Sequence, residues 1–181
     1  VNPDDVNRIL RKGSEEEIIG ILDLLRGYDI SPYLDNLISL LKNYPKQSLR
    51  AFTLLLLKFK GIDKEVGYLY NGEIITVNPL KLEAPFDTET FKKCEEFLRE
   101  NEKNITLANN AVTLFSTYVM LMYPHILTIE NDLLILVAIK QLASKYLNQS
   151  TNVEKACKEH HLDYQEVVNK MNEIEKALEL F

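Results

Sequence analysis

Apolar residues recur at three- and four-residue spacing along most of the chain, which is the period of an amphipathic α-helix. Ser14 followed by Glu17 is a capping-box sequence, which marks the start of a helix. Proline or glycine ends each of the early apolar runs. In the first third of the chain the pattern predicts four helices, over about 3–12, 14–27, 31–44 and 46–60.

The helical spacing stops between residues 62 and 84. Residues 66–77 contain two β-forming segments on either side of Asn71-Gly72, and this dipeptide is a strong hairpin signal. Pro79 and Pro85 follow and mark a linker. We therefore expect a short β-hairpin, and two domains that span 1–84 and 85–181.

Helical spacing returns in the second half of the chain. Residues 133–147 are nearly all apolar, which predicts a central helix that is buried on all sides. The expected helices are 87–102, 106–122, one that begins at Thr128 and includes 133–147, 152–160 and 164–180. The fold class is therefore all-α with one short β-hairpin.

The first four predicted helices look like two copies of one unit, repeated at a spacing of about 34 residues. Each copy is a pair of helices with a tight turn, and Gly27 or Gly61 ends it. The pattern over residues 33–60, with Arg50 early in a second helix after a proline-containing turn, resembles a HEAT repeat. This resemblance implies stacked helical hairpins.

The second half of the chain resembles a cyclin box, and in particular the second core repeat of the transcription factor IIB family. The residues that carry the resemblance are the central apolar helix 133–147, the helix 151–160, the turn 161–163 and the helix 164–180. In that family the last two helices help to grip promoter DNA, and the family functions in transcription. The zinc ribbon of the family is absent from this sequence, as is the pattern by which cyclins engage a kinase.

The charge of the last predicted helix argues against DNA binding, which the resemblance to this family would otherwise imply. Acidic side chains repel a phosphate backbone, and here they outnumber the basic ones. The helix carries Glu166, Glu173, Glu175 and Glu179 against Lys170 and Lys176. The whole chain of 181 residues has a formal net charge of −6. A protein that binds nucleic acid through contacts with its phosphates is expected to carry net positive charge.

Sequence motifs for catalysis, cofactors or metals are not recognisable. The chain has no glycine-rich phosphate loop, no G-x-S-x-G and no H-E-x-x-H. Cys157, His160, His161 and Asp163 are close in sequence, but their spacing matches no zinc pattern. We predict a protein that is not an enzyme and binds no cofactor or metal. Two cysteines without CxxC spacing, and no signal peptide, predict a cytoplasmic protein with reduced thiols.

The candidate docking residues lie between positions 42 and 70. One basic concentration, interrupted only by Asp63, is followed by two tyrosines that alternate with Leu69 on the predicted hairpin. The basic residues either form a docking surface for nucleic acid or an acidic partner, or they are a solvated face. The tyrosines either stack on a partner or cap a core. The residues are Lys42, Lys46, Arg50, Lys58, Lys60, Lys64, Tyr68 and Tyr70.

These observations favour a non-enzymatic protein-interaction or adaptor module, and the resemblance places it in a transcription or replication complex. The expected partner is a protein, with no membrane involved. One alternative is a DNA- or RNA-binding regulatory protein that uses the basic 42–64 edge or the C-terminal pair of helices. Another is a subunit that supports an enzyme without carrying its active site. The sequence leaves the oligomeric state open.

Overall fold

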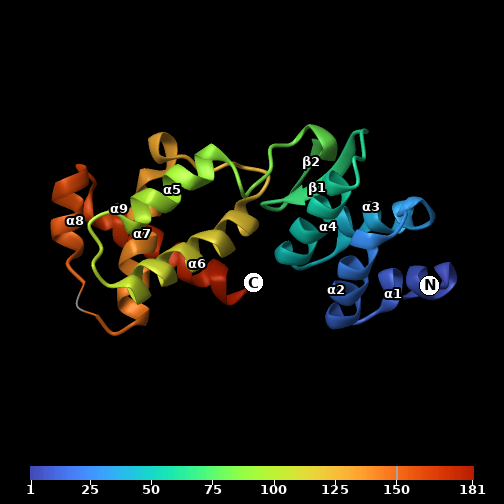
Figure 1. The fold of residues 1–181 in the computed structure, drawn as a ribbon, viewed down its shortest axis with the longest axis horizontal. Helices are drawn as coiled ribbons and strands as arrows, with labels where there is room; N and C mark the ends of the chain where they lie inside the picture. Colours follow the sequence, from blue (N-terminus) through green and yellow to red (C-terminus); the bar gives the residue numbers. More distant parts are fainter. Residues whose placement is uncertain (150) are drawn as a thin grey trace. The chain divides into compact units, whose positions relative to one another are not determined.

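The computed structural model describes residues 1–149 and 151–181 (Figure 1). It is mostly helical, with one antiparallel sheet of two strands among the described residues. The predicted all-α fold with a short β-hairpin is confirmed. The chain divides into two compact units, Val1–Glu83 and Ala84–Phe181, which are called unit 1 and unit 2 below.

Unit 1 begins with two pairs of helices. Within each pair the helices pack together, and across the pairs α1 contacts α3 while α2 contacts α4. The predicted capping box is present, because Ser14 Oγ accepts from the Glu17 backbone and the Glu17 carboxylate accepts from the Ser14 backbone. The helices are α1 (Pro3–Lys12), α2 (Glu15–Leu24), α3 (Leu34–Asn43) and α4 (Gln47–Phe59), with short 3-10 turns at Leu25–Gly27 (η1) and Ser31–Tyr33 (η2).

The hairpin follows α4. Strands β1 (Val66–Tyr70) and β2 (Glu73–Val77) are antiparallel, and Tyr70 pairs with Glu73 across a two-residue turn. Asn71 and Gly72 have φ values of 50° and 80°, which is the left-handed backbone that a tight hairpin turn needs. β1 packs on α3 and α4, so the hairpin is not left as an isolated ribbon. A 3-10 turn, η3 (Pro79–Lys81), then packs on α4.

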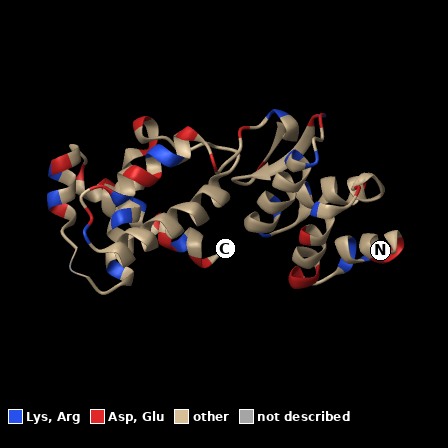
Figure 2. Ribbon diagram, in the orientation of Figure 1, with Lys and Arg blue, Asp and Glu red and all other residues tan. Residues whose placement is uncertain are grey.

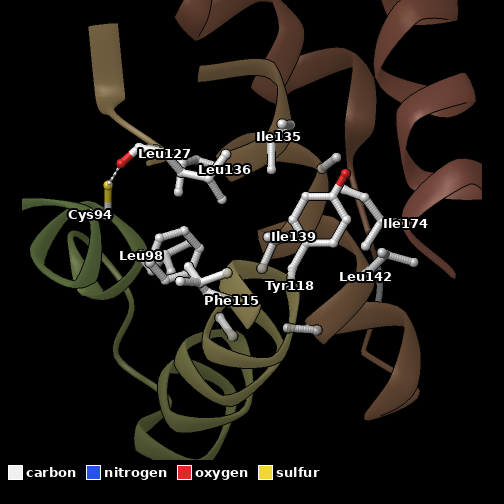
Figure 3. Close-up of a cluster of buried hydrophobic side chains, with 14 of the residues drawn as sticks. Cys94, Leu98, Phe115, Tyr118, Leu127, Ile135, Leu136, Ile139, Leu142 and Ile174 are labelled. Carbon is white, nitrogen blue, oxygen red and sulfur yellow. Dashed lines mark hydrogen bonds between the residues drawn. The ribbon is translucent and has the colours of Figure 1, made fainter. Parts of the chain in front are cut away.

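Unit 2 is a bundle around α7. This helix contacts α5, α6 and α9, and its buried residues run from Ile135 to Ala143. Figure 3 shows Leu136 and Ile139 of α7 in the same cluster as Phe115 of α6. The helix is central as expected, but its burial is limited to residues 135–143, and Tyr146 near its end is exposed. The helices are α5 (Glu89–Arg99), α6 (Ile105–Met122), α7 (Ile129–Tyr146), α8 (Val153–His160) and α9 (Tyr164–Glu179).

Two helices of unit 2 are capped by the residue directly before them. Thr88 Oγ1 caps α5, and Asp87 before it has a left-handed backbone with a φ of 58°. Asn152 Oδ1 caps α8. In each case the residue directly before the helix accepts from a backbone N–H of the first turn, which is the geometry of an N-cap.

Helix α6 is long and apolar enough to cross a membrane, by length and composition alone. The apolar spacing in the sequence predicted a helix over 106–122 but not this property. One face of α6, including Phe115, Tyr118 and Val119, is buried in the core of unit 2. That burial is what the core helix of a globular bundle shows.

Candidate docking surface

The sequence interpretation placed Arg50 on an exposed edge, but the structure places it inside unit 1. Its side chain is 6% exposed and donates hydrogen bonds to Leu69 O (3.1 Å), to Tyr44 O and to Gln47 Oε1 (2.6 Å). Burial lowers the pKa of the guanidinium from its usual value. Arg50 therefore holds β1 and the α3–α4 turn to α4, and its donors face the protein interior.

The two hairpin tyrosines share one face of β1, and their rings stack with centroids 6.3 Å apart. Tyr68 is completely buried, and its hydroxyl accepts from Gln47 Nε2 at 2.9 Å. Burial is also the main reason that the pKa of Tyr68 is raised. Tyr68 is therefore a core residue and is not available to stack on a partner, while Tyr70 is half-buried beside it.

Three of the candidate lysines are engaged within unit 1. Lys46 forms an ion pair with Glu15 of α2, with Nζ 2.7 Å from Oε1. Lys60 Nζ donates to the carbonyls of Arg26 (2.8 Å) and Tyr28 (2.6 Å). Lys58 Nζ donates to Leu80 O at 3.3 Å. These bonds fasten the segment after α2 and the turn η3 to α4.

Lys42 and Lys64 are exposed, and within the described residues neither pairs with an acidic side chain. The stem of Lys42 passes close to Gly67 of β1, where a Cβ would come within 2.9 Å of Lys42 Cδ. Lys64 lies in the loop before β1. The six basic residues therefore do not all lie on one exposed edge, because Arg50 is buried and Lys46, Lys58 and Lys60 bond partners on different elements.

An exposed aromatic side chain stands at the end of α4, between two of these lysines. Phe59 is 70% exposed and is the last residue of α4. Successive helix residues point about 100° apart, so Lys58 and Lys60 lie on either side of it. Their ammonium groups bond the carbonyls of Leu80 and Tyr28, whose side chains are also exposed. These five residues are called the α4-end surface.

Phe59 was not among the residues predicted from the sequence. Residues 54–57 are all leucine, so the apolar arc of α4 appeared to continue around the helix. One signal was available: Phe59 follows Leu55 by four residues, and both lie off the stripe formed by Leu49, Thr53 and Leu56. Leu55 is half-buried in the structure, whereas the three stripe residues are buried.

The cysteines and histidines of unit 2 do not assemble into a reactive or metal-binding group. Cys94 and Cys157 are free and buried, and the Cys94 thiol donates to Leu127 O at 3.7 Å (Figure 3). Burial raises the pKa of Cys94 to about 11, which disfavours the thiolate. Across residues 1–149 and 151–181, no three His, Cys, Asp or Glu side chains are grouped to hold a metal ion.

The C-terminal pair of helices has mixed charge. Acidic and basic residues are interspersed along α8, as Figure 2 shows. On α9, Lys170 pairs with Glu173 at 2.8 Å, and Glu175 pairs with Lys145 of α7 at 3.3 Å. These pairs neutralise positive charge that a phosphate backbone would otherwise attract.

Comparison of the chain with protein-family models, with curated proteins and with solved structures finds no match.

Proposed function

We propose that the protein is a non-enzymatic interaction module that docks an acidic, partly apolar segment of a protein partner on the α4-end surface. The observation that carries the proposal is the exposure of Phe59 between Lys58 and Lys60. Burying such a ring against a partner contributes roughly 1.5–3 kcal/mol. The flanking ammonium groups favour carboxylates on the partner.

Charge favours a protein over a nucleic acid as the partner. The chain has a net charge of −6, Arg50 is buried, and Lys46 is paired with Glu15. An aromatic ring between two lysines is nevertheless also a stacking platform for a single-stranded base. DNA or RNA binding by this surface is therefore the alternative function. The resemblance of residues 87–180 to a cyclin box supports a role in a transcription or replication complex.

The test compares Phe59→Ser with the wild-type chain and with Leu180→Ser. Leu180 is 76% exposed at the end of α9, so its loss is a matched control for removing an exposed apolar side chain. Each variant is used to co-purify proteins from the native cells, and the proteins are quantified by mass spectrometry. We expect at least one protein to be lost with Phe59→Ser and kept with Leu180→Ser, and to bind the purified wild-type chain directly. Identical sets of proteins from all three chains would refute the proposal.

A second measurement addresses the alternative. Fluorescence anisotropy with duplex and single-stranded oligonucleotides is recorded at about 50 mM and about 200 mM salt, a range over which phosphate-driven binding weakens steeply. We expect no binding that depends on Phe59. Binding that weakens with salt and is lost with Phe59→Ser would replace the protein partner with a nucleic acid. Arg50 is unsuitable for this test, because a substitution there would disturb the fold.

A further inference from the structure

The two outer edges of the hairpin in unit 1 differ. β1 packs on α3 and α4, and Arg50 Nε of α4 donates to the Leu69 carbonyl of β1 at 3.1 Å. β2 packs mainly on β1. The edge of β1 is therefore bonded within unit 1, and the edge of β2 is the one that a further strand can reach.

The register of the hairpin shows which main-chain groups of β2 face outward. Tyr70 and Glu73 flank the two-residue turn, so they form the first hydrogen-bonded pair of the ladder. Bonded and non-bonded pairs alternate in an antiparallel ladder, so the N–H and carbonyl groups of Ile74 and Thr76 point away from β1. The Leu69 carbonyl, opposite Ile74, faces outward in the same way and reaches a side chain of α4. Among the residues that the structure describes, no hydrogen bond engages these groups of Ile74 or Thr76.

The side chains of this edge do not protect it from pairing. Natural edge strands are commonly protected by lysine, proline or a β-bulge. Residues 74–77 contain neither lysine nor proline, and the pairing of β1 with β2 is continuous, without a bulge. Ile74 is 56% exposed, and Thr76 is exposed on the same face of the strand. Both side chains are β-branched, which favours strand pairing.

The outer edge of β2 is complementary to itself. Two copies of one strand pair antiparallel about a two-fold axis perpendicular to the sheet, and an axis beside Ile75 suits this edge. Ile74 of one copy then lies opposite Thr76 of the other, and each such pair exchanges two hydrogen bonds. Glu73 lies opposite Val77 of the other copy, so the two carboxylates do not oppose each other.

Other symmetric registers satisfy fewer of these groups. An axis beside Ile74 places Thr76 opposite Gly72, which lies in the turn and has a left-handed backbone. An axis beside Thr76 places Ile74 opposite Asn78, whose carbonyl already accepts from a backbone N–H of η3 at 3.0 Å. The register centred on Ile75 is therefore the one that bonds the outward groups of both Ile74 and Thr76.

We infer that two copies of this chain associate by pairing their β2 strands antiparallel around Ile75, which joins two two-stranded sheets into one of four strands. The pairing bonds the outward groups of β2 and covers Ile74. A sheet of three or more strands is also more stable than a single hairpin. The contact is one short strand from each copy, so it buries little surface and the dimer is weak. It does not involve the α4-end surface and does not depend on the proposed function.

The first test is analytical ultracentrifugation of the full chain at concentrations up to about 1 mM, which covers weak association. We expect a reversible equilibrium between monomer and dimer. Thr76→Pro removes an outward N–H but no bond between β1 and β2, and it should weaken dimerisation at least about tenfold, because each copy loses a hydrogen bond. Thr76→Val keeps that N–H and should dimerise like the wild type. A wild-type chain that stays monomeric, or a folded Thr76→Pro chain that dimerises equally well, would overturn the proposal.

The second test locates the contact in the wild-type chain and needs no variant. Amide hydrogen exchange is followed by NMR at low and high concentration. The Ile74 and Thr76 amides should be protected only in the dimer, whereas the Ile75 amide, which bonds Tyr68 within the hairpin, should be protected in both states. A dimer in which the Ile74 and Thr76 amides exchange as fast as in the monomer would show that the copies meet elsewhere, and the assignment would be wrong.

The register has a test of its own. In a mixture of isotope-labelled and unlabelled chains, we expect an intermolecular NOE between the α-protons of Ile75, because opposite residues of a non-bonded pair have Cα atoms roughly 4.5 Å apart. An NOE from Ile75 to a different residue of β2 would contradict this register.

The Phe59→Ser variant separates this contact from the α4-end surface. Phe59 lies outside the hairpin, so its replacement should leave dimerisation unchanged. If dimerisation were lost with Phe59→Ser and kept with Thr76→Pro, self-association would belong to the α4-end surface and the pairing of β2 would be refuted. Loss of a protein partner with Phe59→Ser has no bearing on β2, so either proposal can fail without the other.

Discussion

The guanidinium of Arg50 joins three parts of unit 1. It bonds the Tyr44 carbonyl at the start of the α3–α4 turn, the Gln47 side chain in the first turn of α4, and the Leu69 carbonyl of β1. A buried charge costs free energy unless hydrogen bonds replace its hydration. Three acceptors at different angles suit the fixed fork of arginine better than the single point charge of lysine. Arg50 is therefore a structural residue.

Replacing Arg50 with alanine should lower the free energy of unfolding by about 2–4 kcal/mol, because two carbonyls and an amide oxygen lose their donors inside the protein. Urea denaturation followed by circular dichroism measures the change. Lys64→Ala removes an exposed cation from the neighbouring loop and should change stability by less than about 0.5 kcal/mol. Equal stability of the two variants would show that the Arg50 bonds contribute little.

At the scale of elements, α7 begins with an interrupted turn. Asp132 has φ −125° and ψ 28°, which is not helical, so the first turn is set apart from the rest of the helix. The Asp132 carboxylate accepts from Thr128 N at 2.9 Å and lies 3.4 Å from His125 Nε2. Thr128 Oγ1 in turn accepts from Asn131 N at 3.1 Å. These bonds satisfy backbone donors at the start of α7.

Asp132→Ala should reduce the free energy of unfolding by about 1–2 kcal/mol, because the Thr128 N–H loses its acceptor. Asn131→Ala is the matched control, since Asn131 contributes its backbone N–H and its side chain is exposed. Thermal unfolding of both variants provides the comparison. A loss in Asn131→Ala as large as that in Asp132→Ala would rule out the carboxylate as the cause.

Local sequence signals predicted the elements well. The Ser14–Glu17 capping box and the Asn71-Gly72 turn depend on residues within a few positions of each other, so the sequence was enough to find them. The positions of Arg50 and Tyr68 depend instead on how the hairpin packs on α4. Periodicity within one element does not contain that information. Arg50 was therefore predicted on a surface, and Tyr68 was left open between stacking on a partner and capping a core.

The candidate site was less predictable for the same reason. Phe59 becomes a feature of the surface only because Lys58 and Lys60 bond segments that are distant in sequence. Leu80, in the turn η3, is 22 residues from Lys58, and no single sequence window shows their contact. The sequence therefore shows where basic residues are frequent, but it does not show which of them are exposed.

At the scale of the whole molecule, each unit has the components of an independent domain. The buried clusters around Phe115 and around Val137 draw all of their residues from unit 2. Unit 1 buries residues of its own from every helix and from both strands of the hairpin. Each unit is longer than the roughly 60 residues at which many small domains fold alone.

We therefore expect residues 1–83 and residues 84–181 to fold when they are produced separately. Each fragment should show a helical circular dichroism spectrum and a cooperative thermal transition, because burial within the unit supplies its stability. A fragment of residues 1–43 lacks α4, which carries much of the unit 1 core, and should not unfold cooperatively. If either complete unit were unfolded alone, its stability would depend on the rest of the chain.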